Sequence, residues 1–152
     1  MFNVVKGDLI KFVVASGASV AHGCNCFCNM GAGVALSIRQ MWPEMYAADQ
    51  ATECGDNKLG YFSYAKLSPT QYGFNLYTQY HYGKGILFQL YALEQSLYKA
   101  LMTLQRCPWA KQHLALPLIG GGLGRGDPVQ IRETIENVAS KFPDIEVTLV
   151  LL

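Results

Sequence analysis

The chain has 152 residues, of which 51% are hydrophobic and 15% are charged, and its formal net charge is +1. This length fits a single domain, residues 1–152, that buries its own core, and so small a net charge gives no basic field for non-specific binding of nucleic acid. No apolar run approaches the roughly 20 residues that span a bilayer, and the start, MFNVVKGDLI, lacks the layout of a signal peptide. We therefore expect a cytoplasmic protein without membrane contact, and we take it to be a monomer.

Short segments rich in β-branched and aromatic residues predict six strands. In chain order they are residues 2–5, 19–24, 61–67, 73–78, 113–119 and 145–151. A helical region lies between the second and third strands, from about Ala32 to Cys54, with a break near Pro43. Apolar residues at helical spacing predict two more helices, one through Leu90, Leu93, Leu97, Leu101 and Leu104 and one through Ile131, Ile135, Val138 and Phe142.

The alternation of strands and helices indicates the fold class. It predicts a three-layer α/β/α domain, with helices on both faces of a largely parallel sheet. Ligands bind such sheets beyond the carboxyl ends of the strands. The loops after residues 24, 78 and 119 are therefore expected to meet at one crevice.

The segment PLIGGGLGRGDP, residues 117–128, follows a predicted buried strand and precedes a helix. Its five glycines let backbone N–H groups approach an anion closely, which favours a phosphate cradle over a turn without a ligand. The segment lacks the Lys-Ser/Thr pair of a P-loop, and Arg125 stands where the motif G-x-G-x-x-G needs a glycine. Asp127, followed by Pro128 and then Gln130, is typical of a helix N-cap, and a catalytic carboxylate is the alternative.

The segment HGCNCFCNMGAGVA, residues 22–35, combines three alternating cysteines with a Gly-Ala-Gly turn. Zinc ligands usually come in pairs about two to four residues apart on turns, so no metal site is expected. Five cysteines without an export signal favour free thiols that serve packing, and a catalytic cysteine paired with His22 or His81 is the alternative. Asparagine hydrogen-bonds ribose hydroxyls and a glycine turn at a helix start binds diphosphate, so this segment predicts a nucleotide loop.

Three segments in this order, residues 7–10 (GDLI), 25–34 and 120–126, resemble the macrodomain family of ADP-ribose binders over nearly the whole chain. HGCNC at 22–26, MGAGVA at 30–35 and NLYTQ at 75–79 are similar to the branch of ADP-ribose-1''-phosphate phosphatases and terminal ADP-ribose glycohydrolases, which includes many phage and bacterial proteins. The resemblance implies a mixed, largely parallel six-stranded sheet, ADP-ribose or a derivative as ligand, and no cofactor.

The resemblance also implies roles for individual residues. Asp8, with Leu9 beside it, would contact the adenine amino group, and a turn or cap aspartate is the alternative. Asn25 would hold the distal ribose. The first glycine loop would bind the diphosphate through Gly31, Ala32, Gly33 and Val34. The second would clamp it through Gly120, Gly121, Gly122, Leu123, Gly124 and Arg125. Among the aromatic residues, which more often form core, Tyr80 is the exposed candidate for ligand contact, together with His81 and Tyr82.

For catalysis the resemblance implies His22, because the phosphatases have a histidine in this segment, and a buried core histidine is the alternative. The human glycohydrolase uses a lysine after the NLYT-like strand and an aspartate in the second loop, whereas here the first lysine is Lys84 and Gly124 replaces the aspartate. We expect metal-independent hydrolysis of ADP-ribose-1''-phosphate, with Asn25 orienting the ribose and His22 or Asp127 activating water. The alternatives are removal of ADP-ribose from modified protein or nucleic acid, and a reader that binds ADP-ribose without turnover.

Overall fold

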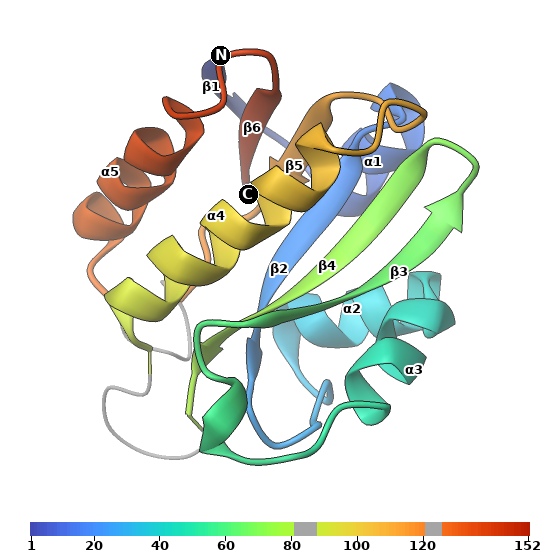
Figure 1. The fold of residues 1–152 in the computed structure, drawn as a ribbon, viewed down its shortest axis with the longest axis vertical. Coiled ribbons are helices and arrows are strands. Elements are labelled where there is room, and N and C mark those ends of the chain that lie inside the picture. The colour runs from blue at the N-terminus through green and yellow to red at the C-terminus, as the bar shows by residue number, and fades with distance from the viewer. Residues whose placement is uncertain (81–87, 121–125) are drawn as a thin grey trace.

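The computed structural model describes residues 1–80, 88–120 and 126–152 (Figure 1). Strands and helices alternate along most of this part of the chain. In chain order the elements are β1 (Phe2–Lys6), α1 (Leu9–Ser16), β2 (Ser19–Asn25), α2 (Gly33–Met41), α3 (Pro43–Gln50), the short 3-10 helix η1 (Asp56–Lys58), β3 (Phe62–Ser68), β4 (Gln71–Gln79), α4 (Leu90–Gln105), β5 (His113–Leu116), α5 (Pro128–Ala139) and β6 (Glu146–Leu151).

The strands form one sheet in the order β1-β6-β5-β2-β4-β3. Neighbouring strands are parallel except for β3 and β4, which are joined by a short turn and run antiparallel at one edge. Each of the six predicted strands is present, and the prediction of a mixed, largely parallel six-stranded sheet is confirmed.

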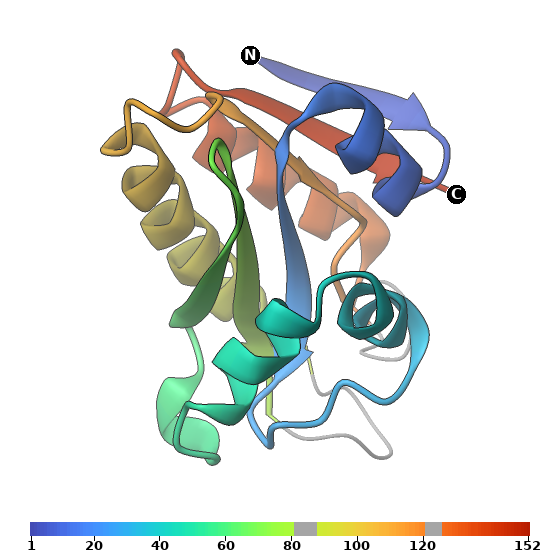
Figure 2. The ribbon, with the colours of Figure 1, turned by 90° about the vertical axis from the view of Figure 1, so that its right-hand side faces the viewer.

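Helices cover both faces of the sheet, which confirms the predicted three layers. On one face α4 and α5 contribute Leu97, Leu101 and Ile135 to a large cluster of buried side chains. On the other face Val13 of α1 and Ile38 of α2 belong to a second cluster, which also includes α3. Figure 2 shows the sheet lying between α4 on one side and α1 on the other.

The structure differs from the sequence prediction at helix α1 and at the end of β5, and it agrees with the prediction at Pro43. Helix α1 is absent from the predicted elements, although Asp8 caps its start and Gly17 ends it with a φ of 74°. The predicted break at Pro43 is confirmed, because Pro43 opens α3 directly after α2. Strand β5 ends at Leu116 rather than at residue 119, since Pro117 has no N–H group to donate to the ladder.

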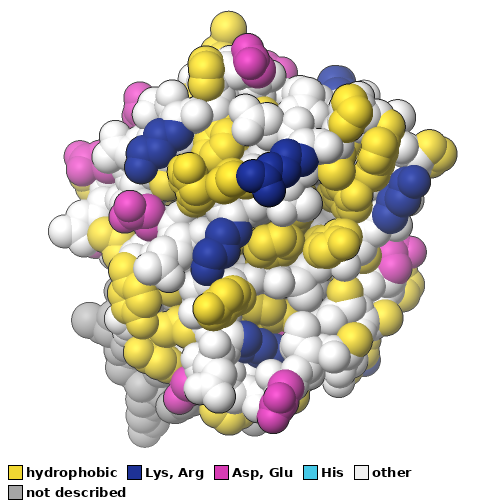
Figure 3. All heavy atoms as spheres, viewed as in Figure 1, with side chains coloured by type: hydrophobic (Ala, Val, Ile, Leu, Met, Phe, Trp, Pro, Cys, Tyr) yellow, Lys and Arg dark blue, Asp and Glu magenta, His cyan; other side chains and the backbone are white. Residues whose placement is uncertain are grey.

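The face formed by β3 and α4 carries basic side chains among hydrophobic ones (Figure 3). Lys99 Nζ lies 3.8 Å from the centre of the Tyr61 ring, and Lys66 Nζ lies 4.4 Å from that of Trp109. These ammonium groups cover the exposed rings and break up the apolar surface of this face. Within the described residues, no helix has the length and apolar character that a bilayer crossing needs.

Candidate functional site

The carboxyl ends of β1, β2, β4 and β5 lie along one edge of the sheet, because these strands run in the same direction. Two backbone hydrogen bonds fasten the chain there. Gly7 N donates to Leu151 O at 2.7 Å, and Cys26 N donates to Tyr80 O at 2.7 Å. Four of the predicted ligand residues are therefore brought to the same edge: Asn25 is the last residue of β2, and Asp8, Tyr80 and Gly120 follow the ends of β1, β4 and β5.

The loop after β2 is organised by its two asparagines. Asn25 Oδ1 accepts from Phe27 N at 2.8 Å, and Asn25 Nδ2 donates to Asn29 O at 3.0 Å. Asn29 Oδ1 in turn accepts from Gly31 N at 2.9 Å, and a Cβ at Gly31 would lie 2.9 Å from the same oxygen. Each end of the Asn25 amide thus makes one bond inside the loop, which leaves one N–H group and one lone pair of the amide for a ribose.

Helix α2 begins at this loop with an exposed N-terminus. Residues 31–34 are all exposed, and the N-cap residue Ala32 has no side-chain hydrogen bond to the helix. Gly33 has a φ of 58°, a left-handed conformation that favours glycine. The first N–H groups of a helix lack intrahelical acceptors and carry partial positive charge, so this end of α2 is suited to an anion.

The second glycine loop is closed at its base over a buried ring. Gly126 N donates to Gly120 O at 2.7 Å, and Phe88, which is 5% exposed, lies against both glycines. A Cβ at Gly120 would lie 2.2 Å from Phe88 Cδ1, and one at Gly126 would lie 2.7 Å from Phe88 Cδ2. The predicted ligand residues Gly121, Gly122, Leu123, Gly124 and Arg125 lie outside the described residues.

Two exposed aspartates cap helices that begin at this edge. Asp8 Oδ1 accepts from Lys11 N at 3.0 Å at the start of α1, and Asp127 Oδ1 accepts from Val129 N at 3.0 Å at the start of α5. The N-cap interpretation is confirmed for both residues. A ligand role for either carboxylate has to be compatible with its cap.

The other two predicted contacts differ in exposure. Leu9 is buried, and its side chain belongs to the core beneath α1. Tyr80 is half-buried, and its hydroxyl lies 3.4 Å from that of Tyr91 on α4. Of these two, Tyr80 is the side chain within reach of a ligand. His81 and Tyr82 lie outside the described residues.

The His22 ring is enclosed by the sheet and is 1% exposed. Its Nε2 lies 2.7 Å from Asn75 Oδ1, and Asn75 Nδ2 donates to Met45 O at 2.9 Å. Because that carbonyl fixes Nδ2 as the donor end of the amide, His22 Nε2 carries the proton and donates. Burial lowers the pKa of His22 to about 4, against the opposing effects of Asn75 and the Asp49 charge. His22 is therefore neutral near pH 7.

A buried polar network that the motifs do not reveal surrounds this histidine. Tyr77 OH donates to Asp49 Oδ1 at 2.7 Å, and Ser63 Oγ lies 2.7 Å from the same hydroxyl. Asp49, which is 1% exposed, is paired with Lys58 Nζ at 3.4 Å. Asn75 Nδ2 completes the connection by donating to Ser63 Oγ at 3.0 Å. The available signal is the alternation of Asn75 and Tyr77 in β4, which places these two side chains on the same face of the sheet, toward α3.

The cysteines divide into two kinds, and the expectation of free thiols is wrong for one pair. Cys24 and Cys26 pack against Tyr77, and burial raises the pKa of the Cys24 thiol well above its usual range and that of Cys26 to about 11. These two thiols stay protonated, as a packing role predicts. Cys28 instead forms a disulfide with Cys54, because β2 ends at Asn25 and the chain turns toward the end of α3.

The described residues contain no group of three or more histidine, cysteine or acidic side chains placed to hold a metal ion. The groups gathered at this edge are the backbone N–H groups at the start of α2, the Asn25 amide and the Asp8 and Asp127 carboxylates. The N–H groups suit a phosphate, and the amide and the carboxylates suit hydroxyl or amino groups.

Comparisons with known sequences give two relatives. No protein-family model matches the chain. A 17.5 kDa protein of Enterobacteria phage T4, described as uncharacterized, is 37% identical over 143 residues, which cover 91% of this chain and 90% of that protein. An ADP-ribose 1''-phosphate phosphatase of Meyerozyma guilliermondii is 39% identical over 44 residues, which cover 29% of this chain and 25% of that protein.

Comparisons with solved structures show the fold. The macrodomain of Mycobacterium tuberculosis DarG superposes with a TM-score of 0.82 and 21% identity, covering 99% of this chain and 97% of that one. Thermosipho africanus DarTG, solved in complex with ADP-ribose, gives a TM-score of 0.77 with 19% identity over 99% of this chain and 42% of that one. The fold implied by the family resemblance is confirmed.

The lowered pKa of His22 predicts acid sensitivity. Between pH 6.5 and about 4 the unfolded chain binds a proton at His22 that the folded chain does not bind, so the free energy of unfolding falls as the pH is lowered through this window, by up to about 3 kcal/mol. Urea unfolding at pH 7 and pH 4.5 measures the loss, and His22→Gln should reduce it. The control His113→Gln should have a smaller effect, because the Glu146 carboxylate offsets part of the burial of His113.

The contact of Gly120 with Phe88 predicts a position that excludes any side chain. Gly120→Ala meets both the φ of 80° and the buried ring, and should lower the free energy of unfolding by about 2–4 kcal/mol. Gly33→Ala is the matched control, since Gly33 has a φ of 58° but nothing within 4 Å of its added Cβ. Equal losses in the two variants, measured by urea unfolding, would show that the ring has room to move.

Proposed function

This chain belongs to the family of the 17.5 kDa protein of phage T4 and has the macrodomain fold, and from this premise we propose that it binds ADP-ribose at the carboxyl edge of its sheet. The observation that carries the proposal is the meeting of the exposed start of α2, the Asn25 amide and the base of the second glycine loop at that edge. A protein of the same fold has been solved in complex with ADP-ribose, which supports the choice of ligand.

In this proposal each part of the ligand has a partner of suitable chemistry. The diphosphate lies at the start of α2, where the N–H groups of Gly33 and Val34 face an anion without a competing cap. The distal ribose hydroxyls pair with the second N–H group and the remaining lone pair of the Asn25 amide, whose two internal bonds orient it. Adenine lies toward the start of α1, within reach of the exposed Asp8 carboxylate.

The reaction we favour is hydrolysis of ADP-ribose-1''-phosphate to ADP-ribose and phosphate. The short match to an ADP-ribose 1''-phosphate phosphatase supports it. We assign activation of the water molecule to Asp127, because its carboxylate is exposed at the start of α5, whereas the His22 ring is buried and donates to Asn75. His22 then acts as a positioning residue, since it fixes the strand end from which Asn25 projects.

A second candidate, binding without turnover, is favoured by one specific observation. The two groups predicted to activate water each make a hydrogen bond within the fold, His22 to Asn75 and Asp127 Oδ1 to the start of α5. A reader of ADP-ribose needs neither group to be free. Removal of ADP-ribose from modified protein or nucleic acid uses the same site with another leaving group, and it is told apart by its product.

The first test is a phosphorus NMR time course of ADP-ribose-1''-phosphate with the EDTA-treated protein. We expect the signal of the anomeric phosphate to disappear as inorganic phosphate grows, because the residues assigned to the site need no metal. Asp127→Ser, whose hydroxyl oxygen replaces the carboxylate oxygen as the N-cap acceptor, removes the carboxylate and should slow the reaction by roughly 10²-fold or more. Signals that shift without conversion would support the reader, and unperturbed signals would contradict ADP-ribose binding at this site.

The assignment of Asn25 predicts a loss of affinity that a remote asparagine does not share. Asn25→Ala should weaken ADP-ribose binding by about tenfold, the effect of one lost hydrogen bond with its unpaired ribose hydroxyl. Isothermal titration calorimetry measures the change. Asn137→Ala on the last turn of α5 is the control, and the same loss in both variants would refute the assignment.

The two proposed properties of Asp8 are separable by two substitutions. Asp8→Ala removes both the cap and the carboxylate, whereas Asp8→Ser keeps a side chain that caps well. Asp8→Ala should lower the free energy of unfolding by about 1 kcal/mol, and Asp8→Ser by a few tenths. Both should weaken ADP-ribose binding if the carboxylate contacts adenine. Unchanged affinity in Asp8→Ser would leave Asp8 as a cap alone.

A further inference from the structure

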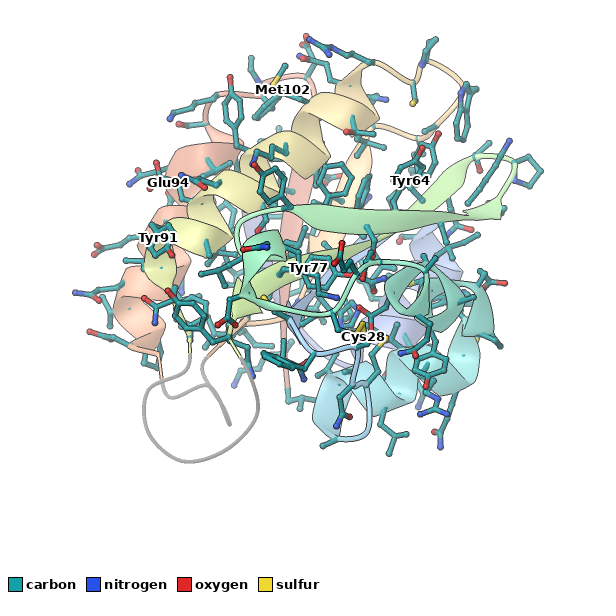
Figure 4. All side chains as sticks on the ribbon, turned by 60° about the horizontal axis from the view of Figure 1, so that its bottom comes forward. Cys28, Tyr64, Tyr77, Tyr91, Glu94 and Met102 are labelled. Atoms are coloured by element: carbon teal, nitrogen blue, oxygen red, sulfur yellow. A yellow bond between two sulfur atoms is a disulfide. The ribbon has the colours of Figure 1, made fainter. Side chains whose placement is uncertain are left out.

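The disulfide between Cys28 and Cys54 ties the loop after β2 to the segment that follows α3. Figure 4 shows Cys28 close to Tyr77 at this edge of the molecule. The same two segments are joined by hydrogen bonds, since Gln50 Nε2 donates to Cys28 O at 2.6 Å and Gly55 N donates to Cys26 O at 2.8 Å. The loop that carries Asn25 and the start of α2 is therefore braced from one side by a covalent bond.

Cys28 has a backbone conformation that depends on this bracing. Its φ is 58°, and among the described residues other than glycine it is the one with a positive φ. A side chain in the left-handed region costs roughly 1 kcal/mol, so the conformation persists where neighbouring contacts hold it. Loss of the disulfide removes one of those contacts and leaves the turn at Cys28 with a weaker hold.

A lysine ammonium lies directly beside the Cys28 sulfur. Lys58 Nζ is 3.5 Å from Cys28 Sγ, and it is held there by Thr52 Oγ1 at 2.7 Å and by the buried Asp49 carboxylate at 3.4 Å. The Lys58 side chain is only 10% exposed, so its charge is poorly screened by water. A fixed cation beside a sulfur stabilises the thiolate, which makes Cys28 a good leaving group in thiol–disulfide exchange.

The other cysteine of the pair, Cys54, lies at the surface. Cys54 is exposed, in contrast to Cys24 and Cys26, which are enclosed by the Tyr77 cluster. An incoming thiolate therefore has access to the Cys54 side of the bond, with the stabilised Cys28 thiolate on the departing side. This is the arrangement of labile disulfides rather than of purely structural ones.

We propose that Cys28 and Cys54 form a reversible redox site that reacts with low-molecular-weight thiols and their disulfides, and that its oxidation fixes the loop after β2 in the conformation that binds ligand. In reduction, a thiolate attacks Cys54 Sγ, a mixed disulfide forms and Cys28 leaves as the thiolate. A second thiolate cleaves the mixed disulfide, so two thiols are oxidised to one small disulfide while the protein gains two thiols. Oxidation by a small disulfide is the reverse sequence.

The effect on the ligand rests on the function proposed above, whereas the redox site does not. With the disulfide formed, the loop that presents Asn25, Asn29 and the start of α2 is held in place. With the two thiols free, binding has to order the loop first. The oxidised protein should therefore bind ADP-ribose at least about fivefold more tightly, the lower end of typical coupling between two linked sites.

The chemistry is tested on the whole protein equilibrated with mixtures of reduced and oxidised glutathione, followed by alkylation and peptide mass spectrometry. When the alkylation is carried out in denaturant, which exposes the buried thiols, we expect a peptide linked through Cys28 and Cys54, with Cys24, Cys26 and Cys107 alkylated. Lys58→Met should slow reduction by dithiothreitol severalfold, and Lys66→Met, whose lysine lies over Trp109, should not. Absence of the linked peptide, or equal rates in the two lysine variants, would overturn the site.

The coupling is tested by two measurements on the oxidised protein, the reduced protein and Cys54→Ser. Hydrogen exchange of residues 26–34, which needs no ligand, should be slower in the oxidised protein than in the other two. Calorimetry with ADP-ribose should give the affinity difference stated above, with Cys107→Ser behaving as the unsubstituted protein. Equal exchange in all forms overturns the coupling. Slower exchange without any ADP-ribose binding leaves the coupling intact and refutes the proposed function instead.

Discussion

The side-chain amide of Asn75 joins helix α3 to two strands that are not neighbours in the sheet. Its Nδ2 donates to Met45 O of α3 and to Ser63 Oγ of β3, so that its Oδ1 is left to accept from His22 of β2. This assignment places the His22 proton on Nε2, and burial makes a charged imidazolium unfavourable, against the opposing effect of the Asn75 hydrogen bond. Because β2 continues from His22 to Asn25, the same amide helps to hold the strand from which the loop after β2 departs.

The loop after β2 packs on buried polar side chains, whereas the base of the second glycine loop packs on a buried aromatic ring. The loop after β2 is polar at its base, where the Asp49–Lys58 pair and the Tyr77 hydroxyl are buried between α3 and the sheet. A buried ion pair is stable only when each charge keeps its hydrogen-bonding partners, so removing one partner of Asp49 or Lys58 would destabilise the residues beneath the loop after β2. The second loop instead closes over the Phe88 ring, a rigid apolar support on which Gly120 and Gly126 lie too close for any side chain.

The sequence predicts the parts of this molecule that depend on periodicity and on turn formers. The six strands, the helices at α4 and α5 and the break at Pro43 follow from local patterns that agree with the final packing. Helix α1 is not predicted, because its residues 12–14 have a composition typical of strands and because Asp8 and Gly17 are its only cap signals. Two further contacts are not predicted for another reason: the Cys28–Cys54 bond and the Asp49–Lys58 pair. Both depend on the position of the end of α3 relative to the loop after β2, and residue spacing in the sequence gives no information on that position.

Among the described residues, four helices begin at the carboxyl edge, and they differ in whether a side chain accepts a hydrogen bond from their first N–H groups. Helices α1 and α5 are capped by Asp8 and Asp127, each of which places a carboxylate on the partial positive charge of its own helix. Helices α2 and α4 have no side-chain cap, and of these two it is α2 whose start is wholly exposed. Alanine at the N-cap sacrifices about 1 kcal/mol relative to serine or aspartate. In the proposed complex a diphosphate would supply the missing acceptors. The helix start that is least stabilised in the free protein would then be the one where an anionic ligand gains most, and the two aspartates would disfavour the anion at the neighbouring helix ends.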